Sequence, residues 1–234
     1  MKAEILGVNV DCLTMTQAVE QVDLLVKNKT PSIVATANAE MLMFANSDAE
    51  LKKILNSAAI VTADGAGTVW AARHLGYEMP ERVAGVDLVT NLFSKGYRFY
   101  FFGSAAGVAD LAAENAAKKF NAKIVGTRNG FFTAEEIPKI LDDINNSNAE
   151  ILLAALGVPK QEKFLYNNLK NLNVPVNIGV GGTLDVLAGK VKRAPRWMQR
   201  AKLEWLFRAL LQPSRAGRLL ALPKFVYNVH KSRH

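Results

Sequence analysis

The stretch AAIVTADGAG, residues 58–67, predicts the local structure on which the whole fold depends. Its first four residues are small and apolar, which is typical of a short strand buried on both faces. The strand leads into one carboxylate, Asp64, which stands among alanine and glycine residues. Asp-Gly is a common turn pair, and an aspartate often caps the helix after such a turn. Asp64 therefore has two interpretations, a turn and cap residue or a functional acid.

The same alternation of a buried strand and a helix recurs along the chain. The predicted strands are residues 32–35, 58–61, 98–102, 123–125, 151–156 and 176–179. The predicted helices are residues 15–26, 40–45, 67–75, 108–120, a stretch opened by Thr133, 161–169 and 183–187. This order predicts an α/β fold, Rossmann-like, with a mostly parallel sheet and helices on both faces. No Gly-x-Gly-x-x-Gly fingerprint follows the first strand, so a standard dinucleotide site is not expected.

Polar residues and glycines follow the predicted strands. Thr36 and Asn38 come after the first strand and Asp64 after the second, while residues 179–182 end the sixth. The carboxyl ends of parallel strands meet at one edge of a sheet, which is the usual place for a ligand. Convergence of these residues at that edge favours the functional interpretation of Asp64.

The stretch IGVGGTLDVLAG, residues 178–189, combines a glycine pair with the start of a helix. Gly181 and Gly182 leave backbone N–H groups unshielded, and a helix starting near Thr183 would direct its N-terminus at the same place. That arrangement suits a phosphate or another anion. The alternative is a tight turn in which Asp185 is an ordinary acid of the first helical turn.

Two further junctions carry side chains suited to an anionic or sugar ligand. PERVAGVD, residues 80–87, presents Arg82 just before a helix, either as an anion clamp or as a surface arginine. LGVPKQEKF, residues 156–164, places Lys160 and Gln161 where a strand passes into a helix.

Charge is distributed unevenly. Residues 190–234 contain twelve Lys and Arg against one acid, Glu204, and so carry +11, which leaves −3 for residues 1–189 of a chain whose net charge is +8. Such asymmetry indicates a polyanionic partner: nucleic acid, a membrane surface or a phosphorylated substrate. From Pro195 the pattern becomes that of basic amphipathic helices with Trp and Phe. The alternative for this appendage is a helix pair docked on the body.

The remaining composition narrows the class of protein. One cysteine, Cys12, excludes an internal disulfide framework. The three histidines lack the spacing of metal ligands, and no apolar run approaches the roughly 18 residues of a membrane span. The N-terminus does not look like a secretory signal. We therefore expect a cytoplasmic protein.

Six stretches resemble the WecG/TagA/CpsF family of bacterial glycosyltransferases. They are TANAE (36–40), ADGAG (63–67), ERVAGVD (81–87), GVPKQE (157–162), GVGGTLDVLAGKVKRAP (179–195) and LEWLFR (203–208). The resemblance is collinear and covers nearly the whole chain. It implies transfer of N-acetylmannosamine (ManNAc) from UDP-ManNAc to undecaprenyl-diphosphate-linked GlcNAc in wall teichoic acid linkage-unit synthesis. It also implies a β-1,4 linkage, inversion at the anomeric carbon, and no metal ion or other cofactor.

The resemblance implies a role for individual residues. Asp64 would be the general base, and small neighbours would leave room for a sugar beside it. Residues implied to hold the ManNAc moiety are Thr36, Arg82 and Gln161, with Asn38 beside them. Residues implied to receive the uridine diphosphate are Gly181, Gly182 and Asp185. Arginines implied to complete the site when the tail closes are Arg208, Arg215 and Arg218.

These expectations divide the chain into two segments and imply where the protein is located and what it binds. Residues 1–194 would form the α/β glycosyltransferase core, and residues 195–234 a helical membrane-associating appendage that completes the active site. A polyprenyl-diphosphate acceptor stays in the bilayer, so we expect a peripheral protein on the inner face of the cell membrane. It would bind no nucleic acid and would be able to form a homo-oligomer off the membrane. One alternative is a family relative using another donor, such as UDP-ManNAcA; another is a nucleotide-sensing module that binds RNA.

Overall fold

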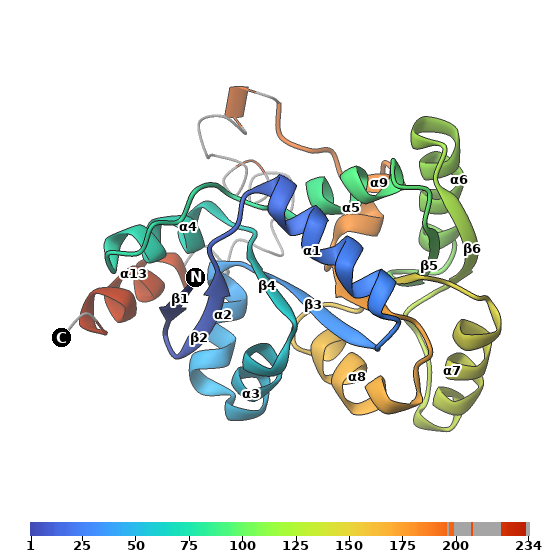
Figure 1. The fold of residues 1–234 in the computed structure, drawn as a ribbon, viewed down its shortest axis with the longest axis horizontal. Helices are drawn as coiled ribbons and strands as arrows, with labels where there is room; N and C mark the ends of the chain where they lie inside the picture. Colours follow the sequence, from blue (N-terminus) through green and yellow to red (C-terminus); the bar gives the residue numbers. More distant parts are fainter. Residues whose placement is uncertain (196, 199–206, 208–220, 233–234) are drawn as a thin grey trace.

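The computed structural model describes residues 1–195, 197, 198, 207 and 221–232, and a six-stranded sheet forms its centre (Figure 1). The strand order is β4-β3-β8-β7-β5-β6, and every neighbouring pair is parallel. The strands are β3 (Ser32–Ala37), β4 (Ile60–Ala63), β5 (Arg98–Gly103), β6 (Lys123–Arg128), β7 (Ile151–Ala155) and β8 (Val176–Gly179). The predicted parallel α/β sheet is thus confirmed, with strand ends that differ from the prediction by a few residues.

Helices cover both faces of this sheet (Figure 1). One face carries α1 (Met15–Asn28), α5 (Gly85–Phe93), α6 (Val108–Phe120) and α9 (Thr183–Leu187). The other carries α2 (Ala39–Ser47), α3 (Ala49–Ser57), α4 (Ala66–His74), α7 (Ile137–Asn146) and α8 (Lys160–Asn168). Short 3₁₀ turns, η1 (Ala134–Glu136) and η2 (Leu169–Asn171), flank α7 and α8. Two hydrophobic cores result, one on each side of the sheet.

Strand β5 shows why the sequence needs both cores. Successive side chains of a strand point to opposite faces. Phe99 and Phe101 accordingly pack into the core under α1, α5 and α6, whereas Tyr100 and Phe102 pack into the core on the opposite side. A strand that is apolar at every position is stable only when both of its faces are covered.

A two-stranded hairpin, β1 (Lys2–Ile5) and β2 (Val8–Asp11), precedes the main sheet and was not predicted from the sequence. Its turn residues, Leu6 and Gly7, both have positive φ values, 52° and 80°, as in the turns favoured by tight hairpins. The buried Asp11 carboxylate accepts a hydrogen bond from Val61 N at 2.9 Å. The hairpin therefore fastens to the edge strand β4.

The last described helix, α13 (Ala221–Lys231), packs against α2 and α4 (Figure 1). Phe225 and Val229, one turn apart, are fully buried in the core beneath these helices. His230 Nδ1 lies 3.0 Å from His74 Nε2 on α4. This end of the predicted appendage is therefore a helix docked on the body. None of the described helices is long and apolar enough to cross a bilayer.

Candidate active site

Asp64 lies directly after β4, at the carboxyl edge of the sheet. Its backbone N donates to Ala37 O at 2.9 Å and so continues the pairing of β4 with β3. Its carboxylate Oδ1 accepts a hydrogen bond from Gly85 N at 3.1 Å. Gly85 is the first residue of α5, and backbone N–H groups at a helix N-terminus stabilise negative charge. The carboxylate is thereby oriented by a helix distant in sequence.

The simpler interpretation, in which Asp64 caps the helix that follows it, is wrong. The N-cap of α4 is Gly65, and that position makes no side-chain capping hydrogen bond. The glycines have a packing role here. A Cβ on Gly65 would lie 3.3 Å from Asn38 Cβ, and a Cβ on Gly67 would lie 3.1 Å from Ala39 Cβ. Small residues around Asp64 therefore let the first turns of α2 and α4 approach each other.

Thr36 and Asn38 lie beside Asp64, as predicted from the ends of the strands. Thr36 is buried, and its hydroxyl donates to Gly179 O at 3.0 Å. A Cβ on Gly85 would lie 3.2 Å from the Thr36 Oγ1, so Thr36 also touches the residue that holds Asp64. Asn38 caps α2 by accepting from Met41 N at 3.0 Å. These side chains come from adjacent strands and form one cluster.

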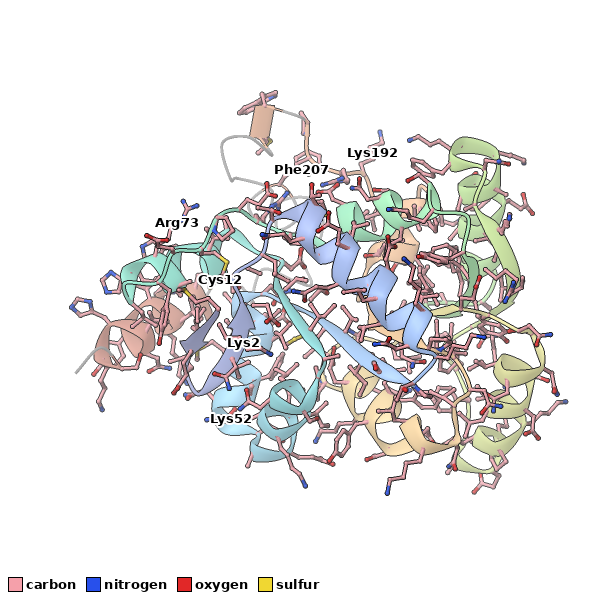
Figure 2. The ribbon with its side chains drawn as sticks, viewed as in Figure 1. Lys2, Cys12, Lys52, Arg73, Lys192 and Phe207 are labelled. Carbon is pink, nitrogen blue, oxygen red and sulfur yellow. The ribbon has the colours of Figure 1, made fainter. Side chains whose placement is uncertain are left out.

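The loop that carries Arg82 is tied to the same edge. Val83 N donates to Ala63 O at 2.9 Å, immediately before Asp64. Arg73 on α4, labelled in Figure 2, donates from Nε and Nη2 to Met79 O at 2.9 and 2.7 Å. Arg82 therefore directly precedes a residue, Val83, whose backbone is hydrogen-bonded to the end of β4.

A carboxylate on α5 joins two arginines near this loop. Arg193 donates two hydrogen bonds to Asp87, at 2.6 and 3.0 Å, and Arg82 approaches the same carboxylate at 3.8 Å. Bidentate arginine–carboxylate pairs are strong and directional. Sequence reasoning assigned no role to Asp87 or Arg193, although both lie in the stretches that carry the family resemblance.

Gln161 is fully buried at the start of α8 and connects two predicted binding regions. Its Oε1 accepts from Gly181 N at 3.0 Å, and its Nε2 donates to Glu162 Oε1 at 2.7 Å. The residue implied to hold the sugar therefore contacts the turn implied to receive the diphosphate. Glu162, which sequence reasoning missed, is 1 % exposed, and burial raises its pKa to about 7.

The glycine turn after β8 has the expected conformation, but its helix is short. Gly181 has a φ of +51°, and Gly182 is the N-cap of α9, which spans only Thr183–Leu187. Asp185 Oδ2 accepts from Ser104 Oγ at 3.2 Å, which joins the loops after β8 and β5. Gly181 N already donates to Gln161 Oε1 and Thr183 N to Val180 O at 3.1 Å, so two of the backbone N–H groups of this turn are satisfied within the fold.

The predicted site residues thus fall into one region of the described structure. Thr36 is the penultimate residue of β3, Asn38 and Asp64 follow β3 and β4, and the turn at Gly181 follows β8. These three strands are adjacent, and Gln161 follows β7. Arg208, Arg215 and Arg218 lie outside the described residues. In the described part of the chain, no three His, Cys, Asp or Glu side chains gather as a metal-binding group.

The ionisation of Glu162 should make stability depend on pH. The folded chain holds this proton up to a pKa of about 7, against about 4.5 for the unfolded group, so stability falls as pH rises between these values. Each pKa unit corresponds to about 1.4 kcal/mol, so the loss is on the order of 3 kcal/mol by pH 8. We expect urea denaturation at pH 4.5 and pH 8 to show that the free energy of unfolding of Glu162→Gln falls by less than that of the wild-type protein, the difference being this amount. Parallel pH dependences for the two proteins would contradict the assignment.

Comparison with known proteins gives a consistent result over the whole chain. A model of the family described as "Glycosyl transferase WecG/TagA/CpsF family" matches residues 3–234. The N-acetylglucosaminyldiphosphoundecaprenol N-acetyl-beta-D-mannosaminyltransferase of Bacillus subtilis is 32% identical over 211 residues, which cover 88% of this chain and 82% of the relative. The enzyme of the same name from Staphylococcus aureus (strain NCTC 8325 / PS 47) is 28% identical over 238 residues, covering 99% and 93%.

Proposed function

The chain belongs to the glycosyl transferase WecG/TagA/CpsF family, and from this membership we propose that it is an inverting ManNAc transferase of wall teichoic acid linkage-unit synthesis. The relatives from B. subtilis and S. aureus are named as N-acetylmannosaminyl transferases acting on N-acetylglucosaminyldiphosphoundecaprenol. We propose the same acceptor here, with UDP-ManNAc as the donor and a β-1,4 bond as the product.

One observation carries this proposal: the Asp64 carboxylate, oriented by Gly85 N, in the cluster with Thr36 and Asn38. The acceptor hydroxyl attacks the anomeric carbon from the face opposite the diphosphate. A new oxygen–carbon bond forms, the bond from the anomeric carbon to the diphosphate oxygen breaks, and Asp64 takes the hydroxyl proton. Carboxylates are weak bases, so the orientation of Asp64 supplies much of the effect.

The donor would lie across the cluster and the glycine turn. Thr36, Asn38, Arg82 and Gln161 hold the ManNAc moiety, and Gly181, Gly182 and Asp185 receive the uridine diphosphate. The 3.8 Å contact of Arg82 with Asp87 is longer than the two hydrogen bonds from Arg193. Asp87 would therefore keep both hydrogen bonds from Arg193 if Arg82 turned to a substrate group.

The basic appendage would supply positive charge that stabilises the leaving diphosphate. In this proposal Arg208, Arg215 and Arg218 stabilise UDP as it departs, so that transfer is independent of a metal ion. The acceptor is a membrane lipid, so residues 195–234 would also bring residues 1–194 to the inner face of the cytoplasmic membrane. Off the membrane the chain would be able to form a homo-oligomer.

A UDP-release assay tests the function directly. Purified protein is offered a panel of UDP-sugars with a short-chain prenyl-diphosphate-GlcNAc acceptor, and mass spectrometry identifies the product. We expect UDP-ManNAc to be the preferred donor and ManNAc-GlcNAc to be formed. Preference for UDP-ManNAcA would identify another member of the family. Stoichiometric RNA binding with no UDP release from any donor would reject the transferase proposal.

Arg82→Ala should weaken productive use of the donor more than it weakens binding of UDP. A charge-assisted hydrogen bond contributes about 1.5–3 kcal/mol, so the KM for UDP-ManNAc should rise roughly 10- to 100-fold. Calorimetry should find the Kd of UDP alone nearly unchanged, because Arg82 is assigned to the sugar. Arg98→Ala is the matched control, since Arg98 begins β5 at the amino edge of the sheet. An equal loss of UDP affinity would place Arg82 on the nucleotide.

A chelator should leave turnover unaffected. Arginines and backbone N–H groups are assigned to the leaving diphosphate, so the reaction should proceed in EDTA at the rate measured with added Mg²⁺. A strict requirement for Mg²⁺ or Mn²⁺ would show that a metal ion, and not these groups, stabilises the negative charge of the leaving diphosphate.

A further inference from the structure

Glu162 is a buried acid at the carboxyl edge of the sheet that the proposed reaction does not use. Its Oε1 accepts from Gln161 Nε2 at 2.7 Å, and its Oε2 is buried without a hydrogen-bond partner. A Cβ on Gly179 would lie 2.8 Å from Gln161 Nε2 and 2.9 Å from Glu162 Oε1. Both side chains therefore pack directly on the last residue of β8, where only glycine leaves room for them.

A carboxyl group in this position does not improve the stability of the fold. Glu162 is 1 % exposed, and its neighbours Phe164 and Leu165 on the same helix are part of the hydrophobic core between α8 and the sheet. A buried carboxyl oxygen without a partner costs free energy that an apolar side chain of the same size would not cost. The group is more simply explained by what its other oxygen does.

That other oxygen selects the orientation of the Gln161 carboxamide. A carboxamide has a donor end and an acceptor end, and the two ends can exchange by rotation. With Nε2 directed at Glu162, Oε1 accepts from Gly181 N at 3.0 Å. The reverse orientation would bring Nε2 against the Gly181 N–H, where two donors face each other and the hydrogen bond is lost.

We propose that Glu162 is a positioning residue for the transferase reaction, which orients Gln161 and through it the Gly181–Gly182 turn that receives the UDP diphosphate. The assignment of the turn to UDP rests on the proposed function. The hydrogen bonds from Gln161 to Glu162 and from Gly181 to Gln161 do not depend on that assignment. Thr36, whose hydroxyl donates to Gly179 O, braces the same strand end from the side of the sugar.

Two replacements of Glu162 separate positioning from bulk structure. Glu162→Gln keeps a carbonyl oxygen that accepts from Gln161, so UDP affinity and the KM for UDP-ManNAc should stay within about threefold of wild type. Glu162→Met keeps the volume and removes the acceptor. Loss of two oriented hydrogen bonds at about 1 kcal/mol each should weaken UDP binding and raise this KM roughly 10- to 30-fold. Its melting temperature reports any effect on the fold separately from the effect on UDP binding.

Glu150→Met is the matched control. The Glu150 carboxylate also accepts a hydrogen bond, from the backbone Arg98 N at 3.0 Å, but at the amino edge of the sheet. This variant should bind UDP normally whatever its melting temperature. A folded Glu162→Met protein with wild-type UDP affinity and KM would overturn the proposal. So would a loss of affinity that Glu162→Gln shares, since that would indicate a structural need for this carboxyl group.

Nuclear magnetic resonance of the wild-type protein tests the same contact without substrate. The side-chain N–H protons of Gln161, assigned by their absence in Gln161→Glu, should exchange with solvent slowly, and in Glu162→Gln equally slowly. Rapid exchange in the wild-type protein would overturn the positioning role even if Glu162→Met does not fold. If wild-type protein neither binds UDP nor turns over UDP-ManNAc, the proposed function fails while this measurement still decides the geometry.

Discussion

Asp64→Asn is expected to lower turnover by roughly two to four orders of magnitude, the usual contribution of a positioned acid–base group. Asparagine has the same shape, and its carbonyl oxygen can still accept from Gly85 N, as Asp64 Oδ1 does at 3.1 Å. It cannot take the proton from the acceptor hydroxyl. Steady-state kinetics with saturating donor should therefore show a large fall in kcat, while donor affinity and melting temperature change little.

Asp48→Asn is the control for this replacement. Asp48 caps α3 and accepts from Leu51 N at 3.0 Å, so it is likewise a carboxylate that accepts from a backbone N–H near a helix start, and the proposed reaction gives it no role. This variant should keep full activity. If instead Asp64→Asn melts much earlier and turns over normally, the carboxylate serves only to hold α5.

Replacing the tail arginines should have the second-largest effect. We expect at least one of Arg208→Ala, Arg215→Ala and Arg218→Ala to lower turnover on a soluble acceptor by about 100- to 1000-fold, as removal of a preorganised donor does. A soluble acceptor makes anchoring irrelevant, so any loss of kcat must come from the reaction itself. Turnover is measured with the short-chain acceptor, and vesicle binding is measured separately by sedimentation.

Lys224→Ala and Lys231→Ala are the controls, because both lysines are exposed on α13. A basic residue near an anionic surface contributes about 1 kcal/mol to binding, whatever its identity. The lysine variants should therefore weaken vesicle binding and leave turnover unchanged. If all three arginine variants behave like the lysine variants, the tail is an anchor only. Truncation after Pro195 is a poorer test, since it also removes Phe225 and Val229 from the core.

Local pattern was sufficient to predict the main sheet. Each strand of the sheet is a short apolar run, and apolar runs separated by amphipathic helices allow few other arrangements. The capping box of α1, Thr14 with Gln17, follows the known sequence pattern and is present in the structure. Helix α3 was missed although its signal exists, because Asp48 precedes Leu51, Ile54 and Leu55 at helical spacing.

The hairpin β1–β2 was missed for a different reason. Its strands have four residues each, and the Leu6–Gly7 turn lacks the Asn-Gly or Asp-Gly pair that marks most tight hairpins. The alternation of buried and exposed residues was present, but four residues are too few to distinguish it from a loop.

Some residues of the candidate site could be predicted from local pattern, and others depend on contacts between distant parts of the chain. Thr36, Asn38 and Asp64 were predictable because they lie at or just beyond the carboxyl ends of strands, and parallel strands bring these ends together. The partnership of Asp87 with Arg193 was not, since 106 residues separate them and either charge could have met solvent or another partner. Glu162 was hidden because an acid beside Gln161 on a helix is most often exposed.

The docking of α13 gives the appendage a second attachment to the body. Arg193, just before the appendage, binds Asp87, and Phe225 and Val229 near the end of the appendage pack against α2 and α4. Residues 196–220 are joined covalently to the body at both ends, so any encounter of Arg208, Arg215 and Arg218 with the site is intramolecular. Intramolecular binding through short linkers corresponds to effective concentrations in the millimolar range. At the micromolar concentrations typical of an enzyme assay, adding the appendage as a separate peptide should therefore rescue a truncated chain only in large excess.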